Sequence, residues 1–169
     1  MRWTICCTCL LLAAGGVSGA ELDRLLKDEK IFSRSIRDFA GTYAKPLRFR
    51  PQSRSGKSWR HRGDNSTILG LPVIEGLVGF RDQRLHRLAF SIYNRGDVDM
   101  LDRPAFEALV EKAVKAVSAF TGKSPRRRRD SGASKKDSYL WIVGDRLFRL
   151  DCNDGKTRVQ GEVVYRSEY

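Results

Sequence analysis

Apolar residues recur at helical spacing over one long stretch in the second half of the chain. Between residues 103 and 121 they follow the i, i+3, i+4, i+7 pattern, and charged residues occupy the opposite face. Asp102 stands where an N-cap is expected, Pro104 suits the first turn, and Gly122 suits the position after the last turn. The pattern predicts an amphipathic helix over 103–121 with one face toward a core.

Alternation of apolar and polar residues predicts strands on both sides of this helix. The runs at 71–80 and 85–93 flank the turn-like "RDQR" and predict an antiparallel hairpin. Three further runs, at 139–143, 147–152 and 157–165, are separated by turn residues, beginning with Gly144 and Asp145. They predict a three-stranded meander.

The N-terminal third has shorter signals. Apolar spacing within 21–45 predicts one or two short helices, and Gly41 interrupts the pattern. Residues 45–62 are rich in Pro, Ser and Gly, which indicates an irregular segment with short strands around Phe49 and Trp59. Together these elements predict an α+β domain: one antiparallel sheet of five to six strands, the helix 103–121 on one face, and short N-terminal helices.

The first twenty residues have the layout of a secretory signal peptide. Arg2 precedes a short apolar run, and small residues end at Ala20, so cleavage is expected between Ala20 and Glu21. The alternative is a buried N-terminal helix. Export would make the protein periplasmic or secreted and would leave a single domain, 21–169, with no span across a membrane. It would also leave Cys152 alone, so no internal disulfide is expected.

The charge of the chain, +12, is concentrated in two segments. Residues 45–62 hold seven Lys or Arg and no acid, and residues 123–136 hold seven with one Asp. Both are expected to be basic loops, which favours local electrostatic patches over a uniformly basic surface. They could bind a polyanion such as a heparin-like sugar, nucleic acid or an anionic surface, with Phe49 and Trp59 available for base stacking. The alternative is solvated loops whose charge only aids solubility. The candidate binding residues are Arg48, Arg50, Arg54, Lys57, Arg60, Arg62, Arg126, Arg127, Arg128, Arg129, Lys135 and Lys136.

The tripeptide Arg-Gly-Asp occurs twice, at 62–64 and 95–97, and can serve as an adhesion motif. The second copy stands between the hairpin and the helix, where turn and cap roles for Gly96, Asp97 and Asp102 are the simpler interpretation. The cluster of aspartates at 97, 99 and 102 lacks the glycine and the later glutamate of a calcium loop.

The sequence contains little indication of a catalytic site. The only nucleophile and base candidates are Cys152 with His61 or His86, and no local motif pairs them. Their number and spacing fit no metal site, and no cofactor-binding motif is present. The sequence therefore predicts a protein that is not an enzyme. Asn65 begins a glycosylation sequon, Asn-Ser-Thr.

A wider resemblance covers residues 59–169. The run "EGLVGFRDQRLHRLAFSIYNRGD", the helix "FEALVEKAVKAVSAFTGK" and the run "YLWIVGDRLFRLDCNDG" resemble a domain of exported bacterial proteins, mostly from the Verrucomicrobia and their relatives. In those proteins the domain precedes a papain-like, bacteriocin-processing-type cysteine peptidase domain. The resemblance implies a non-catalytic accessory or pro-region-like module, in a truncated or degenerate member of the group, with a cysteine peptidase as its partner.

Two functions are therefore expected first: a non-catalytic, exported protein-interaction module, and a polyanion-binding protein that uses the two basic segments. Adhesion through Arg-Gly-Asp ranks behind both.

Overall fold

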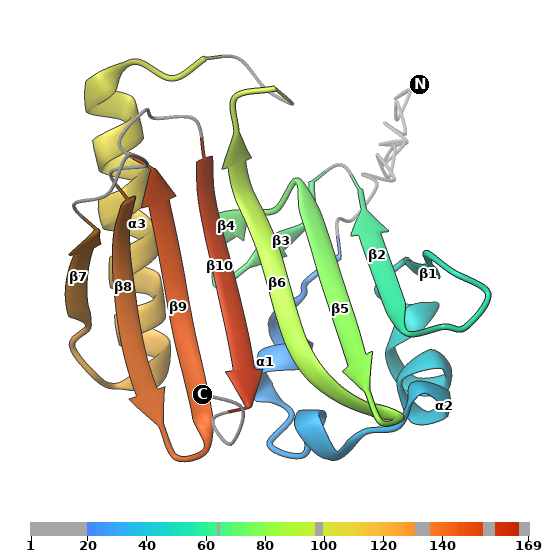
Figure 1. Ribbon diagram of the computed structural model, residues 1–169. Coiled ribbons are helices and arrows are strands. Elements are labelled where there is room, and N and C mark those ends of the chain that lie inside the picture. Colours follow the sequence, from blue (N-terminus) through green and yellow to red (C-terminus); the bar gives the residue numbers. More distant parts are fainter. Residues whose placement is uncertain (1–19, 64, 97–99, 131–135, 154–157, 166–169) are drawn as a thin grey trace, which may run out of the picture.

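The fold is mostly β. The computed structural model describes residues 20–63, 65–96, 100–130, 136–153 and 158–165. Within these residues the chain forms one eight-stranded antiparallel sheet, a two-stranded sheet, one 19-residue helix and several short helices (Figure 1). The expected α+β class, with a sheet of five or six strands, is therefore wrong.

The predicted hairpin and meander form the centre of the sheet. Strand β5 (Glu75–Arg81) and strand β6 (Arg84–Asn94) pair around a two-residue turn, and β5 buries alternate residues as the pattern requires. The meander consists of β8 (Lys136–Val143), β9 (Arg146–Asn153) and β10 (Arg158–Tyr165). Gly144, with φ of 59°, occupies the turn between β8 and β9.

Helix α3 (Arg103–Thr121) has the bounds predicted from its pattern. The side chain of Asp102 accepts a hydrogen bond of 2.8 Å from the N–H of Ala105, and Gly122 ends the helix in the left-handed region. Phe106 and Ala113 are buried, and the rest of the apolar face is partly buried against the sheet. Local capping and tertiary packing therefore agree over this segment.

The strand order is β1-β2-β5-β6-β10-β9-β8-β7. The last strand, β10, lies between β6 and β9, so the meander continues the hairpin into a single sheet. This pairing joins residues more than sixty positions apart, such as Leu88 and Val163. No local sequence pattern predicts a pairing between strands that lie so far apart in the chain.

The outer strands come from the two basic segments. Strands β1 (Phe49–Pro51) and β2 (Ser58–Arg62) lie at one edge, around the two aromatic residues where short strands were expected. Strand β7 (Arg126–Asp130) lies at the other edge. The expected basic loop over 123–136 is therefore wrong for residues 126–130 and 136, because an arginine run can form an edge strand whose side chains stay in water.

Short helices precede the sheet. They are α1 (Asp23–Lys27), the 3₁₀ turn Ile31–Ser33, α2 (Ile36–Phe39) and the π-helical turn Ala40–Ala44, in agreement with the short helices expected over 21–45. A small hairpin, β3 (Thr67–Ile68) and β4 (Leu71–Pro72), follows β2. The expected signal peptide, residues 1–20, lies outside the described residues except for Ala20.

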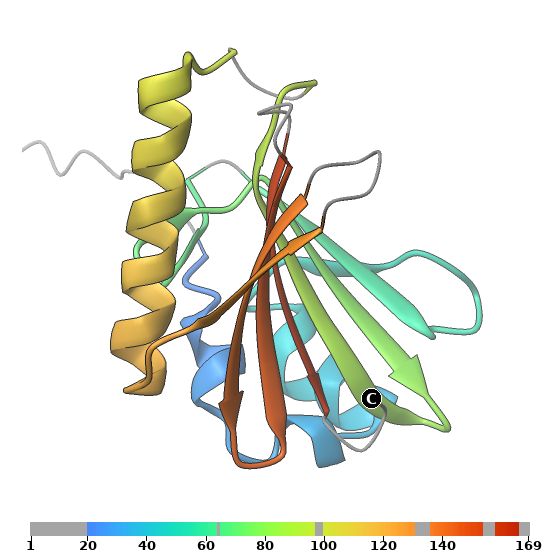
Figure 2. The ribbon, with the colours of Figure 1, turned by 60° about the vertical axis from the view of Figure 1, so that its left-hand side comes forward.

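All these helices cover the same face of the sheet, as Figures 1 and 2 show together. The core lies in this layer. A row of buried apolar side chains crosses five neighbouring strands in register; it consists of Trp141, Phe148, Val163, Leu88 and Val78. The indole N–H of Trp141 donates to the hydroxyl of Ser118 on α3 and so ties the helix to this row.

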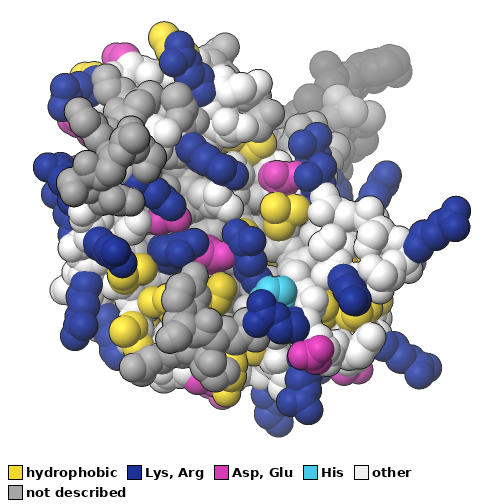
Figure 3. All heavy atoms as spheres, viewed as in Figure 1, with side chains coloured by type: hydrophobic (Ala, Val, Ile, Leu, Met, Phe, Trp, Pro, Cys, Tyr) yellow, Lys and Arg dark blue, Asp and Glu magenta, His cyan; other side chains and the backbone are white. Residues whose placement is uncertain are grey.

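In the described part of the chain, no helix covers the other face of the sheet. Figure 3 views this face and shows many Lys and Arg side chains on it. No helix among the described residues has the length and apolar character needed to cross a membrane.

Candidate functional site

The first basic segment forms an open groove at the β1 edge of the sheet. The groove has a volume of about 920 Å³ and is lined by five cationic side chains: Lys45, Arg48, Arg50, Arg60 and Arg62. Four of these were predicted from the sequence as binding residues. Lys45 belongs to the same basic segment and, like Arg48, lies outside strands β1 and β2.

Strand pairing brings these charges together. Arg50 on β1 lies directly opposite Arg60 on β2. Like charges in directly opposed positions of a strand pair destabilise the sheet. The pair lies at an exposed edge of the sheet, where Arg50 and Arg62 are open to water, and water screens the repulsion between the charges.

Few carboxylates compensate the groove. Glu75 on β5 lies 2.6 Å from Arg60 and 3.4 Å from Arg62. Among the described residues no ion pair is recorded for Lys45, Arg48 or Arg50. The groove therefore carries a clear excess of positive charge.

In the middle of the same sheet, by contrast, positive and negative side chains compensate one another. Glu162, with only 7% of its side chain exposed, contacts both Arg87 and Arg149. Asp151 then lies 3.2 Å from Arg149 and 2.7 Å from Lys136. Cations and carboxylates alternate across these four strands, in contrast to the groove at the β1 edge.

The backbone at Arg48 is also unusual. Its φ is 56°, in the left-handed region that non-glycine residues enter at a cost of roughly 1–2 kcal/mol. Strained residues of this kind cluster at functional sites. Asn65, Leu69, Asp82 and Gln83 also have a positive φ, and the N–H of Arg48 bonds to the carbonyl of Lys45 just after the π-helical turn, so this conformation by itself does not indicate a function.

Two predicted residues lie elsewhere. Arg54 and Lys57 belong to the connection between β1 and β2 and are exposed, but they do not line the groove. They add to the positive potential at this edge without being part of its walls.

The two aromatic residues expected to stack bases face the other way. Phe49 is buried, and its ring packs edge-on against Phe39. Trp59 also packs against Phe39 and donates from its indole N–H to the carbonyl of Gly56 at 2.9 Å. Phe49 also lines the groove, but only 4% of this residue is exposed, and Trp59 does not line the groove, so neither ring offers an open face to a ligand there.

The second basic segment lies far from the first. Seven strand spacings separate β7 from β1, a distance of about 34 Å. The two segments therefore do not form one continuous site. Lys135 and Asp97 lie outside the described residues, and Lys136 pairs with Asp151 at the start of β8.

Within β7 the four arginines divide by strand alternation. Arg127 and Arg129 lie on the α3 side and contact Asp137, at 2.7 Å and 3.2 Å. The hydrogen bond from Arg127, with support from Arg129, holds the pKa of Asp137 below its usual value. For Arg126 and Arg128 no acidic partner is recorded among the described residues.

A buried polar pair behind the groove was not predicted. His61 is fully buried; its Nδ1 lies 2.6 Å from the carbonyl of Leu47, and its Nε2 lies 2.8 Å from the hydroxyl of Ser66. A carbonyl only accepts, so Nδ1 donates to Leu47, and Nε2 accepts from Ser66. Burial, with a contribution from nearby Arg48, lowers the pKa of His61. The imidazole is therefore neutral and holds the chain beside the groove.

The candidate catalytic groups do not meet. Three strands lie between His61 on β2 and Cys152 on β9. His86 lies near the start of β6, whereas the register places Cys152 beside the other end of that strand. Burial raises the pKa of the Cys152 thiol to about 12, so the thiolate needed for nucleophilic attack is scarce.

The second Arg-Gly-Asp copy is only partly described. Gly96 does not have a positive φ, and no described atom lies within 4 Å of the position a Cβ would take. The expectation that its backbone geometry requires glycine is therefore wrong. Asp64, the end of the first copy, lies outside the described residues.

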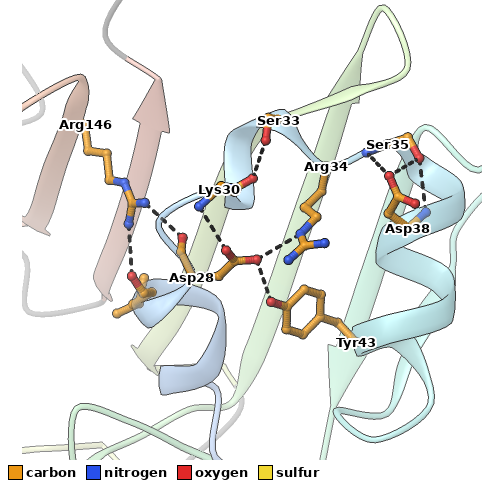
Figure 4. A network of polar contacts seen from close by, with 9 residues as sticks. Asp28, Lys30, Ser33, Arg34, Ser35, Asp38, Tyr43 and Arg146 are labelled. Carbon is orange, nitrogen blue, oxygen red and sulfur yellow. Dashed lines mark hydrogen bonds and ion pairs between the residues drawn. The ribbon is translucent and has the colours of Figure 1, made fainter.

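A second cluster of polar side chains, around Asp28, has a structural role. Asp28 accepts from Tyr43 at 2.6 Å and from Arg34 at 3.0 Å (Figure 4). Burial would raise the pKa of Asp28, but these bonds and one from the N–H of Lys30 outweigh burial and lower it. Arg146 reaches the same region from β9. All of these groups satisfy one another, so the cluster leaves little capacity for a ligand.

Comparison of the chain with models of protein families, with curated proteins and with solved structures finds no match.

Proposed function

We propose that the protein binds a polyanion in the cationic groove at the β1 edge, through charge alone. The observation that carries the proposal is the convergence of five Lys and Arg side chains on one open groove, with Glu75 as the carboxylate that pairs within it. Export, as predicted from the first twenty residues, would bring such a groove into contact with extracellular or periplasmic polyanions.

The chemistry of the groove favours sulfate or phosphate groups. A guanidinium presents a planar set of donors that matches both anions, and Arg48, Arg50 and Arg62 each present one at an exposed position. Release of condensed counterions from the polymer adds to the affinity and makes it depend steeply on salt.

The core positions of Phe49 and Trp59 narrow the ligand class. Without an aromatic platform, a nucleic acid gains no stacking energy over another polymer of the same charge density. The groove therefore gives a nucleic acid no advantage over a heparin-like sulfated sugar of the same charge density, and single-stranded nucleic acids of different base composition should bind alike.

The test compares two double variants with the same change of net charge. Arg48→Gln with Arg50→Gln removes two cations from the groove, whereas Arg24→Gln with Arg37→Gln removes two exposed cations from the helical layer. We expect the groove variant to bind a heparin oligosaccharide about tenfold more weakly at physiological salt, and the slope of log affinity against log salt to fall by about two. Fluorescence titration across a salt series measures both quantities.

Equal losses in the two double variants would reject the groove and leave only a general effect of net charge. A wild-type affinity that does not change with salt would reject the proposal altogether.

The peptidase-associated role implied by the resemblance remains a separate prediction. Co-purification with a host cysteine peptidase is its test.

A further inference from the structure

The opposite edge of the sheet offers a different kind of surface. Strand β7 (Arg126–Asp130) pairs with β8 along its full length, from Arg126 opposite Leu140 to Asp130 opposite Lys136. In the described part of the chain no strand pairs with its other side. Alternate N–H and C=O groups of an edge strand point outward and can pair with another strand.

The side chains of this edge restrict which strand can pair with it. Four consecutive residues, 126–129, are arginines, so both faces of the strand carry positive charge. In a full-length antiparallel pairing of two copies of β7, three of the five residue pairs would place arginine opposite arginine, which destabilises a strand pair. The edge therefore opposes self-association, whereas a strand with acidic side chains meets complementary charges.

The two faces of β7 differ in what they offer. Arg127 and Arg129 already contact Asp137, whereas Arg126 and Arg128, on the uncovered face, are exposed and have no recorded acidic partner among the described residues. Carboxylates of an added strand should therefore lie on the uncovered face, opposite this second pair.

A groove accompanies the edge on the other face. It has a volume of about 730 Å³ and lies between α3 and strands β7 and β8. Val110 and Val114 of α3 are only partly buried and line it, together with Tyr139 of β8. Charged side chains, among them Glu111, Arg127 and Arg129, also line the groove, so an added strand that directs alternate side chains toward it meets apolar surface only in part, at Val110, Val114 and Tyr139.

We propose that β7 binds an extended peptide of a partner protein, with acidic and apolar residues in alternation, as an additional antiparallel or parallel strand of the sheet. Main-chain hydrogen bonds supply affinity in this mode, and alternate side chains supply specificity. The ligand is a protein segment at a different edge, so the inference is independent of polyanion binding in the β1 groove.

The test uses a short peptide of alternating Glu and Val, with its binding measured by fluorescence anisotropy. Two derivatives carry N-methyl groups on one or the other alternating set of residues. A strand pairs through only one of these sets, so we expect one derivative to lose binding at least tenfold and the other to bind like the parent peptide. Binding should also slow hydrogen exchange of backbone amides within Arg126–Asp130.

Substitutions of arginines test whether the peptide binds at β7. Arg126→Gln with Arg128→Gln should weaken peptide binding about tenfold, because it removes two complementary cross-strand charge pairs. Arg24→Gln with Arg37→Gln, which makes the same change of net charge in the helical layer, should leave peptide binding unchanged. These residues are exposed, so the variants are expected to fold, and unchanged far-ultraviolet circular dichroism checks this.

Three outcomes would overturn the inference: absence of binding by the parent peptide, equal binding by both N-methylated derivatives, or equal losses in the two double variants. Equal binding by the derivatives would mean that charge alone attracts the peptide. A failure of the heparin test would leave all three measurements unaffected.

Discussion

At the scale of single residues, the direction of each side chain along β2 decides what the groove can bind. Trp59 and His61 face the core layer, while Arg60 and Arg62 face the groove. The same segment of sequence therefore supplies both the support and the charge. Alternation in a strand explains the split, because successive side chains point to opposite faces.

His61 gives the first prediction. Its pKa is lowered by burial, so between that value and about 6.5 the unfolded chain binds a proton that the folded chain does not. The contribution of His61 to stability is therefore present above about pH 6.5 and is lost as the pH falls toward the lowered pKa. Urea unfolding at a series of pH values between about 7.5 and 5 should show a falling free energy of unfolding.

Ser66→Ala should lower stability at neutral pH by about 1–3 kcal/mol, since it leaves the buried Nε2 of His61 without its donor. A free energy of unfolding that stays constant over this pH range would contradict the neutral, buried imidazole.

At the scale of elements, the turns show where local chemistry and tertiary demands disagree. The hairpin β5–β6 turns through Asp82 and Gln83, both with positive φ, at 48° and 65°. Such a turn favours Asn-Gly or Asp-Gly. Gln83 is therefore held in an unfavourable backbone conformation, while its carbonyl accepts a hydrogen bond from the N–H of Ile36.

Gln83→Gly is the second prediction. Glycine relieves the left-handed strain and keeps the backbone bond to Ile36, so the free energy of unfolding should rise by about 0.5–1 kcal/mol. Chemical denaturation measures the change. Arg84→Gly, at the neighbouring position without a positive φ, should lower stability instead. Destabilisation by both substitutions would show that the Gln83 side chain matters more than its backbone.

At the scale of the whole molecule, a few long-range contacts join the N-terminal helices to the meander. Arg146, at the start of β9, donates to the carbonyl of Leu26 at 3.0 Å and to the carbonyl of Asp28 at 2.9 Å (Figure 4). Its guanidinium also lies over the ring of Phe32. These contacts join positions more than a hundred residues apart.

Arg146→Met is the third prediction. It removes two charge-assisted hydrogen bonds and leaves two carbonyls to find new partners, so stability should fall by about 3 kcal/mol. Hydrogen exchange over residues 23–33 should accelerate more than exchange in β6. Arg37→Met, an exposed substitution on α2, should change stability by less than about 0.5 kcal/mol. Equal effects of the two variants would mean that Arg146 does not join the layers.

The residues of the groove show which parts of the candidate site could be predicted from the sequence. The basic segment 45–62 and most of its groove residues were evident from composition, because a cluster of cations without acids needs no structure to be seen. The packing of Phe49 and Trp59 against the core was not evident, since Phe49 stands between two arginines and Trp59 stands beside one, which suggests exposure. The Ser66 hydroxyl also gave no signal as a partner of His61, because a single serine is common and its contact depends on the fold of the chain around β2 and β3.

What the sequence determined by itself is local: helix α3 with its Asp102 cap, the β5–β6 hairpin, the meander, and the amount of charge in the two basic segments. These features depend on residues close together in the chain, so periodicity and turn chemistry suffice. The tertiary structure alone decided that β10 joins the hairpin to the meander, that the arginine run becomes an edge strand, and that the basic segments lie at opposite edges of one sheet. Strand pairing is the reason, because partners in a sheet are chosen by burial and complementarity among residues far apart in sequence.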